Sequence, residues 1–165
     1  MVKWLRHSKS AMWLTTLIRL YLAYEWISGG VEKITSGFSA KGFIMGAINH
    51  PVMTPENTQA YKLYTAFLKS VVAPNVNVFS FVVSWGELLV GLGLLFGALA
   101  TAAAFFGMLM NFAYLFAGTV SVNPLFLILE FIILVAGYNA SKIGLDHWIV
   151  PWMRDRVGWL KRSVD

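Results

Sequence analysis

The stretch that decides the fold is residues 76–97, VNVFSFVVSWGELLVGLGLLFG, which is mostly apolar and contains one charged side chain, Glu87. About 20 consecutive apolar residues are enough for a helix to cross the hydrocarbon core of a bilayer. Residues 76–97 have this length. They therefore predict a membrane-spanning helix that carries an acid near its middle.

Three further stretches of this kind flank it, at residues 11–29, 101–118 and 124–143. Of the 165 residues, 58% are hydrophobic and 13% are charged, and the mean hydropathy is +0.64. A soluble domain has about 25% charged residues, so this composition excludes one. The sequence predicts a single all-α membrane domain over residues 1–165, built as a polytopic four-helix bundle.

The basic residues predict the orientation of these spans. Eight of the 13 Lys and Arg residues precede the first span or follow Ala140, near the end of the fourth: Lys3, Arg6, Lys9, Lys142, Arg154, Arg156, Lys161 and Arg162. Lys and Arg are enriched on the cytoplasmic side of membrane helices. We therefore expect a multi-pass protein of the cell membrane with cytoplasmic N- and C-termini and an external loop at residues 30–75. The net charge of +5 then reflects topology, and no nucleic-acid partner is expected.

The external loop is predicted to contain two helices. Thr54, Pro55 and Glu56 have the form of a helix start, and apolar residues follow at helical spacing as far as Pro74. A weaker helical pattern covers residues 37–48. We expect these helices to form a lid over the outer ends of the spans.

The tail, residues 146–165, is predicted to be a cytoplasmic amphipathic helix. Trp148, Trp152 and Trp159 share one helical face, and basic residues lie opposite. Tryptophan and basic residues are typical of helices at a membrane surface. The tail is therefore expected at the inner leaflet.

Four ionisable side chains fall within the predicted spans: Arg19, Glu25, Glu87 and Glu130. A charge in the hydrocarbon core costs roughly 2.5–3.5 kcal/mol on insertion scales, so such groups are the first candidates for function. We expect Arg19 to pair with Glu87, either for packing alone or as part of a reactive site. Glu130 has no evident cationic partner on its helical face.

Together these groups predict one polar pocket in the outer half of the bundle. Its candidate ligand-binding residues are Arg19, Glu25, Glu87, Asn111, Asn123 and Glu130, with Trp26, Trp85 and Tyr114 as aromatic lining. The chain has no cysteine, which excludes thiol and iron–sulfur chemistry, and its three histidines lie at unmatched depths for a bis-histidine haem. No metal site, covalent cofactor or catalytic motif is expected.

Several motifs resemble the DoxX family of small four-span membrane proteins, whose relatives include the DoxD subunit of thiosulfate:quinone oxidoreductase. They are Arg19 with residues 29–33, residues 85–93 (WGELLVGLG), 104–111, 118–124 and, most specifically, 136–146 (AGYNASKIGLD). The likeness covers about residues 17–152. It implies a four-helix bundle associated with membrane redox chemistry, often as one part of a complex.

Two functions are consistent with these features. The first is a membrane subunit of a redox complex that binds quinone in the pocket, where donors to the quinone carbonyls and a proton route are available in principle. The second is a non-catalytic scaffold or assembly partner of a redox or stress-response enzyme. The sequence does not decide whether the chain is an enzyme. Expected partners are the lipid bilayer, a redox-enzyme subunit and a second copy of the chain in a homo-oligomer. A transporter is disfavoured because no half of the chain is repeated.

Overall fold

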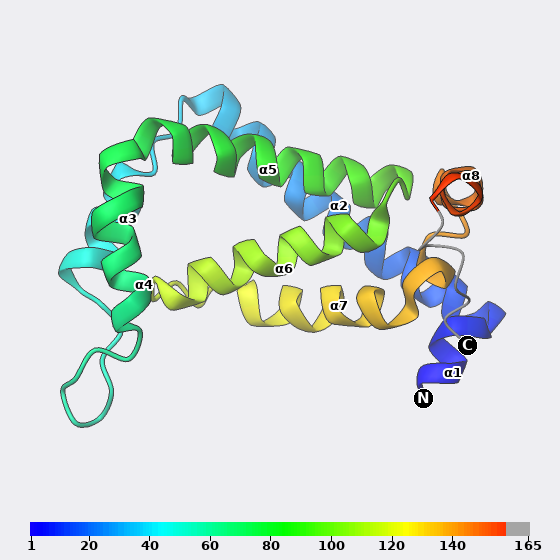
Figure 1. The fold of residues 1–165 in the computed structure, drawn as a ribbon, viewed down its shortest axis with the longest axis horizontal. Helices are drawn as coiled ribbons and strands as arrows, with labels where there is room; N and C mark the ends of the chain where they lie inside the picture. Colours follow the sequence, from blue (N-terminus) through cyan, green and yellow to red (C-terminus); the bar gives the residue numbers. More distant parts are fainter. Residues whose placement is uncertain (158–165) are drawn as a thin grey trace.

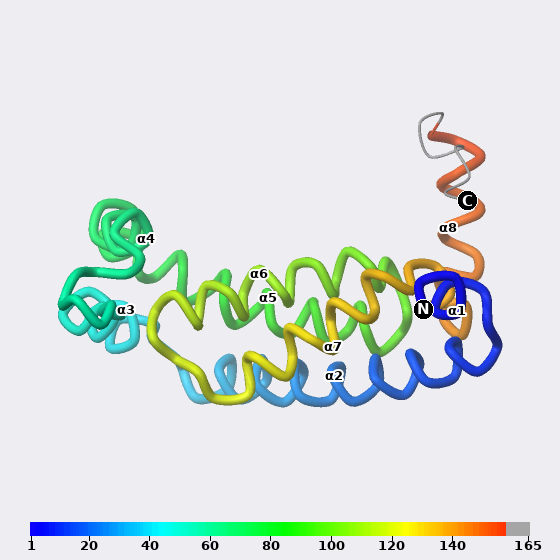
Figure 2. The backbone as a smooth tube through the Cα atoms, turned by 90° about the horizontal axis from the view of Figure 1, so that it is seen from below, coloured from blue at the N-terminus to red at the C-terminus, as the bar shows by residue number. Residues whose placement is uncertain are grey.

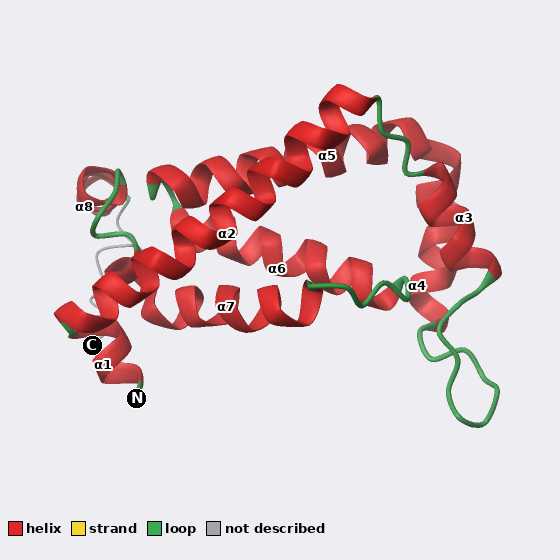
Figure 3. Ribbon diagram, turned by 180° about the vertical axis from the view of Figure 1, so that it is seen from behind, coloured by secondary structure: helices red, strands yellow, loops and turns green. Residues whose placement is uncertain are grey.

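The computed structural model describes residues 1–157, which are helical and contain no named strand. The helices are α1 (Val2–His7), α2 (Lys9–Ser36), α3 (Lys41–Asn49), α4 (Lys62–Phe67), α5 (Val76–Phe96), α6 (Ala100–Phe116), α7 (Asn123–Ala136) and α8 (Asp146–Arg156). The predicted all-α class is confirmed. Figure 3 shows these helices joined by loops, the most prominent of which connects α3 to α4.

Four helices, α2, α5, α6 and α7, lie side by side along the length of the molecule (Figures 1 and 2). α2 packs mainly on α5, and α6 packs mainly on α7. Contacts of α5 with α6 and of α2 with α7 join the two pairs. α1 and α8 lie at one end of these helices and α3 and α4 at the other (Figure 1), which we call the α1/α8 end and the α3/α4 end.

Helix α2 is longer than the first predicted span, 11–29. It begins after Ser8, whose hydroxyl accepts a hydrogen bond from the Ser10 N–H at 3.2 Å. It continues to Ser36 and ends at Gly37, whose φ of 67° is favourable for glycine. The prediction stopped short because it took Gly29 as a helix end, whereas the neighbouring Gly30 marks a close approach between helices: a Cβ at Gly30 would lie 2.6 Å from the Leu88 backbone nitrogen.

The helix predicted to start at Thr54 is wrong. Residues 54–60 form turns, and α4 begins only at Lys62. The Thr54 hydroxyl contacts the Thr58 hydroxyl at 3.1 Å, which closes a local turn in place of a helix start. The weaker pattern at 37–48 is helical as α3, which begins at Lys41.

The chain is helical without a break from α4 to the end of α5, yet it changes direction on the way (Figure 1). Between the two helices lie a π-helical turn, Leu68–Val72, and a 3₁₀ turn, Ala73–Asn75. Pro74 lies in the second turn, and because proline has no N–H the regular helical hydrogen bonding is interrupted there. The bend lets α4 lie across the ends of the long helices.

Two apolar clusters hold the molecule together. The larger one lies between the long helices and includes Leu22, Leu94 and Ile133. The smaller one attaches α3 and the π-helical turn to the ends of α5 and α6. Here the Tyr64 hydroxyl also donates to the Ala113 carbonyl at 2.8 Å. The α3/α4 end is therefore packed onto the long helices.

The long helices expose many large apolar side chains and bury several polar ones among the apolar residues of the interior. Large apolar side chains are exposed on all four, for example Leu17 (64%), Phe81 (62%), Phe106 (57%) and Ile128 (60%). Buried polar side chains include Arg19, Glu87, Asn111 and Glu130. In a soluble domain, charged side chains are rarely fully buried, and large apolar side chains are not exposed along every helix.

Among the described residues, two helical stretches are long and apolar enough to cross a membrane, Lys62–Phe96 and Asn123–Ala140. The first covers the second predicted span, 76–97, as far as Phe96, and the second covers the fourth, 124–143, only as far as Ala140, because the chain leaves the helix there. α6, the third, is apolar but has only 17 residues, which is about 25 Å of helix at 1.5 Å per residue. α2 is long enough but is less apolar, because it carries Arg19 and Glu25.

Candidate functional site

The residues of the predicted pocket do not form one site. The expected Arg19–Glu87 ion pair is wrong, because the two side chains have other partners. Arg19 forms its hydrogen bonds at the α1/α8 end, and Glu87 forms its own near the α3/α4 end. Glu130 has a third set of hydrogen-bond partners.

Arg19 is buried on α2 and donates to main-chain carbonyls. Its Nη1 lies 2.7 Å from the Leu94 carbonyl oxygen, in the last turn of α5, and its Nη2 lies 2.5 Å from that of Ile143. The last carbonyls of a helix have no partner within the helix, so the guanidinium caps α5. Gly97 makes room for it, since a Cβ there would collide with Nη1.

Asp146 completes this end of the molecule. Its carboxylate is buried and accepts hydrogen bonds from the Leu99 N–H at 2.6 Å and the Ala100 N–H at 3.0 Å, at the start of α6. These N–H groups are unpaired within the helix, and a carboxylate there also faces the positive end of the helix dipole. Gly144 packs closely against Gly97. A Cβ added at Gly144 would lie 2.8 Å from the Phe96 carbonyl oxygen. Arg19 and Asp146 thus lock the segment 143–146 onto the α5–α6 connection.

Glu130 of α7 is fully buried and is held by neutral donors. Its carboxyl group accepts a hydrogen bond from the Trp26 Nε1–H at 3.0 Å and another from the Asn111 amide at 2.8 Å. Gly107 provides the space, because a Cβ there would collide with Glu130 Oε1. No basic side chain of the described residues pairs with this carboxyl group.

Glu87 of α5 forms the one ion pair among residues 1–157. Its Oε2 lies 2.7 Å from Lys33 Nζ, and its Oε1 accepts a hydrogen bond from the Tyr114 hydroxyl at 2.7 Å. The Glu87 side chain is 6% exposed and that of Lys33 is 27% exposed. Gly29 lies close to this carboxylate, because a Cβ added at Gly29 would lie 3.2 Å from Oε2. The pair therefore connects the interior of the protein to its surface.

The Glu87 and Glu130 sites are neighbours along the helices. Asn111 and Tyr114, which bind the two carboxyl groups, are three residues apart on α6. Trp26 and Lys33, their partners on α2, are seven residues apart. Both spacings place side chains on one helical face. The two sites thus form a line of polar side chains between the four long helices.

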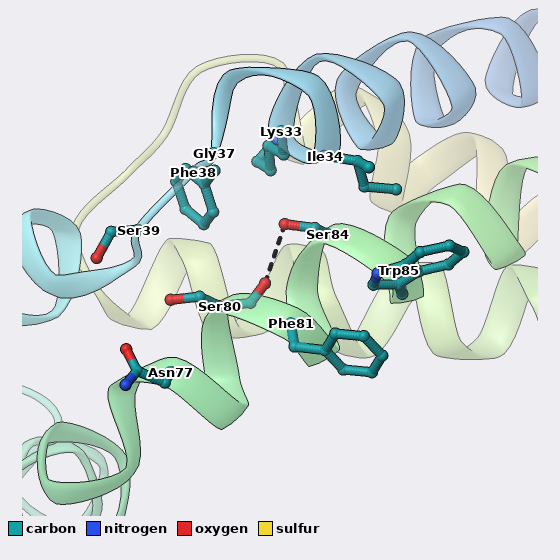
Figure 4. A pocket seen from close by; sticks show the side chains of 10 residues that line it. All are labelled: Lys33, Ile34, Gly37, Phe38, Ser39, Asn77, Ser80, Phe81, Ser84 and Trp85. Carbon is teal, nitrogen blue, oxygen red and sulfur yellow. Dashed lines mark hydrogen bonds between the residues drawn. The ribbon is translucent and has the colours of Figure 1, made fainter.

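An open groove of about 400 Å³ lies beside Lys33. Figure 4 shows its lining: Lys33, Ile34, Gly37, Phe38, Ser39, Asn77, Ser80, Phe81, Ser84 and Trp85. Lys33 Nζ lies 5.7 Å from the centre of the Phe38 ring, and the Ser84 hydroxyl donates to the Ser80 carbonyl at 2.9 Å. The groove combines hydrogen-bonding groups with aromatic walls. We call it the Lys33 groove.

The other predicted site residues lie apart from these clusters. Glu25 is partly exposed on α2 and has no ion-pair partner among the described residues. The Asn123 amide donates to the Thr119 carbonyl at 2.8 Å and so closes the turn before α7. Trp85 is 44% exposed, packs beside Phe81 and lines the Lys33 groove. Only Trp26, Asn111 and Glu130, and separately Glu87 and Tyr114, come together.

Sequence reasoning missed Lys33 and Asp146 as parts of these sites. Lys33 was counted with the external loop and left out of the predicted pocket, although its spacing places it on one helical face with Trp26. That spacing was the available signal for including it. Asp146 belongs to a motif noted only for its resemblance, and its hydrogen bonds go to backbone groups, which leave no pattern in the sequence.

The described residues contain no group of three or more His, Cys, Asp or Glu side chains arranged to hold a metal ion. What the site offers is a lysine, two buried carboxyl groups, a tyrosine hydroxyl and an open groove. Such groups can donate hydrogen bonds to carbonyl oxygens of a ligand and can transfer protons. No family model matches the chain, and comparisons with curated proteins and with solved structures give no match.

Proposed function

We propose that this chain is an integral membrane protein in which α2, α5, α6 and α7 form a four-helix bundle across a bilayer. The observation that carries the proposal is the distribution of side chains on these helices, with apolar outer faces and with Arg19, Glu87 and Glu130 buried between them. An apolar surface of this extent is costly in water. In hydrocarbon, polar groups must instead face the interior of a bundle and find partners there.

The same proposal gives the orientation. Basic side chains gather at the α1/α8 end, among them Lys3, Lys9, Lys142, Arg154 and Arg156. By the enrichment of Lys and Arg on the cytoplasmic side, we assign this end to the cytoplasm and α3 and α4 to the outside. The resemblance to the DoxX family supports the same arrangement, and its most specific motif, residues 136–146, contains the Gly144 and Asp146 contacts.

Within this framework we assign a quinone head group to the Lys33 groove, as part of a membrane redox complex. A quinone travels within the lipid, and the groove adjoins the exposed side chains Phe81 and Trp85. The Lys33 amine would donate to a quinone carbonyl, while Glu87 holds that amine and Tyr114 holds the Glu87 carboxylate. The bound quinone would supply the redox chemistry that these side chains lack.

A non-catalytic scaffold or assembly partner of a redox or stress-response enzyme is the second candidate. It is favoured by the way the buried charges are satisfied within the chain itself. Arg19 binds two carbonyls, and Glu130 accepts from Trp26 and Asn111. These contacts stabilise the packing without any ligand.

The test is a titration of the purified full-length protein in lipid nanodiscs with short-chain ubiquinone and menaquinone analogues. Lys33→Met should weaken binding about tenfold, which corresponds to one hydrogen bond from a charged donor. Trp85→Leu should also weaken it and leaves the ion pair intact. Lys41→Met, an exposed lysine at the same end, is the matched control and should change nothing.

Two results would count against the quinone assignment. One is the absence of binding by the unaltered protein, and the other is binding that is equal in all four proteins. In that case, purification of the complex from native membranes tests the scaffold function. Recovery of a redox enzyme at stoichiometric yield would support it, and recovery of the chain alone would contradict it.

A further inference from the structure

A second groove, at the α1/α8 end, has no part in the sites described so far. Its volume is about 630 Å³. It is lined by Leu95, Phe96, Lys142, Ile143, Gly144, Leu145, His147 and Trp148. We call it the Lys142 groove. It lies where the end of α5 meets the segment that leads into α8, and Figure 1 shows α8 beside this end of α5.

The walls of the Lys142 groove are apolar and continue onto the outer face of α5. Phe96, Leu145 and Trp148 are large exposed hydrophobic residues. Val82, Leu89 and Phe96 are also exposed and are spaced by seven residues, so they share one face of α5. This face forms an apolar track that runs along the helix and ends in the groove. Its shape and chemistry suit a hydrocarbon chain lying beside α5.

Basic side chains lie on the Lys142 side of the groove. Lys142 Nζ lies 5.7 Å from the centre of the Tyr138 ring, and Arg154 Cζ lies 6.0 Å from the same ring, so one aromatic side chain positions both cations. Lys142 and His147 line the groove itself. Two cations held around one ring next to an apolar track favour a ligand with an anionic head and an acyl tail.

The acidic residues nearby do not cancel this charge. The Asp146 carboxylate is buried and accepts from two N–H groups of the α6 start. Asp155 lies between Arg154 and Arg156 in the sequence, and Arg156 Cζ lies 4.6 Å from the centre of the Trp152 ring. The segment therefore keeps a net positive charge towards solvent. Figure 2 shows α8 directed away from the long helices, as expected for a helix lying along a membrane surface.

We propose that the Lys142 groove binds one anionic phospholipid of the inner leaflet. Lys142 and Arg154 bind its phosphate, and one acyl chain lies along the Phe96, Leu89 and Val82 face of α5. The proposal rests on the proposed membrane function and adds to it a lipid specificity. It does not depend on quinone binding, which is assigned to the opposite end of the helices.

The test uses the full-length protein in detergent and counts bound lipid by native mass spectrometry. Dioleoylphosphatidylglycerol should bind more tightly than dioleoylphosphatidylcholine, which has the same chains but no net charge. One basic residue near anionic lipid contributes a factor of about five in affinity. Lys142→Gln should therefore lower the phosphatidylglycerol affinity about fivefold, and the double variant with Arg154→Gln should lower it about 25-fold, with phosphatidylcholine unaffected. Lys62→Gln, an exposed lysine at the α3/α4 end, is the control.

Three outcomes would overturn the proposal: equal affinity for the two lipids, an unchanged affinity of the double variant, or equally tight binding of sn-glycerol 3-phosphate, which has the phosphate but no acyl chain. Washing native membranes with alkaline carbonate separates this failure from a failure of the proposed membrane function. A chain that stays in the membrane but shows no lipid preference overturns only the lipid site. A chain that carbonate releases overturns the membrane assignment itself.

Discussion

Each end of the long helices contains a buried charged side chain, but the hydrogen-bond partners of the two side chains are of different kinds. At the α1/α8 end, Arg19 donates to the backbone carbonyls of Leu94 and Ile143. Near the α3/α4 end, Glu87 accepts from the Lys33 and Tyr114 side chains. Backbone carbonyls are fixed by the fold, whereas an amine or a hydroxyl can turn towards a ligand. The first site is therefore held by groups that the fold fixes, and the second by side chains that can change their partners.

The glycines around the two sites differ in the same way. Gly97 has a φ of 60°, and a Cβ on it would meet both the Arg19 guanidinium and, at 3.0 Å, the Gly144 backbone. Gly29 faces only the far ends of the Glu87 and Lys33 side chains, at 3.2 and 3.7 Å. Backbone cannot move aside cheaply, while the end of a side chain can. The α1/α8 end should therefore be the more sensitive to substitution.

The largest effect is expected from Arg19→Leu. The change leaves the Leu94 and Ile143 carbonyls without their donor and the buried Asp146 without its nearby positive charge. Removing one partner from a buried charged network costs about 3–5 kcal/mol. The free energy of unfolding, measured by SDS titration of the protein in mixed micelles, should fall by this amount.

Arg156→Leu is the matched control for this substitution, because Arg156 is an exposed arginine whose packing partner, Trp152, is exposed as well. Arg156→Leu should change the free energy of unfolding by no more than about 0.5 kcal/mol. If Arg19→Leu unfolds at the same SDS fraction as the control, the Arg19 cap on α5 does not stabilise the protein, and the contrast between the two ends is lost.

The next effect compares Gly97→Ala with Gly29→Ala. At Gly97 the new side chain is strained by the positive φ and overlaps its neighbours, so we expect a loss of about 2–4 kcal/mol. At Gly29 the better helix propensity of alanine offsets a small shift of Glu87, and the net change should be within about 0.5 kcal/mol. The same SDS titration measures both. Equal losses at the two glycines would mean that the Glu87 site is as rigidly packed as the Arg19 site.

The limits of the sequence prediction follow from this difference between backbone and side-chain partners. The second span was predicted well because an uninterrupted apolar run ends at a glycine, and α5 covers Val76–Phe96 against the predicted 76–97. Periodicity assigns Arg19 to a face of α2, but it does not say towards which end of the helix the long side chain extends. The Ile143 carbonyl that it binds belongs to a segment with no matching side-chain signal.

The sequence identified most residues of the candidate site, but it did not show that they form two separate clusters. Glu87, Glu130, Asn111, Trp26 and Tyr114 were all identified, since polar residues stand out in apolar helices. Their division into two clusters depends on which helices approach most closely. That is decided by Gly30 against Leu88 and by Gly107 against Glu130, contacts between segments far apart in the sequence.

The smallest of these effects tests whether the Glu87 cluster is held together by exchangeable side-chain contacts. Tyr114→Phe removes one hydrogen bond to Glu87 but keeps the ring in place, and Glu87 keeps its ion pair with Lys33. We expect the free energy of unfolding to fall by about 1–2 kcal/mol, and by no more than about 0.5 kcal/mol for the control Tyr24→Phe, whose ring is exposed on α2.

In the Lys33→Met background Glu87 depends on Tyr114 alone, so Tyr114→Phe should lower the free energy of unfolding by more there. This difference measures the coupling within the cluster. Identical losses in the two backgrounds would show that Lys33 and Tyr114 act independently on Glu87. A loss as large as that of Arg19→Leu would show that this end is a rigid structural lock as well, which would leave no free donor for a ligand in the Lys33 groove.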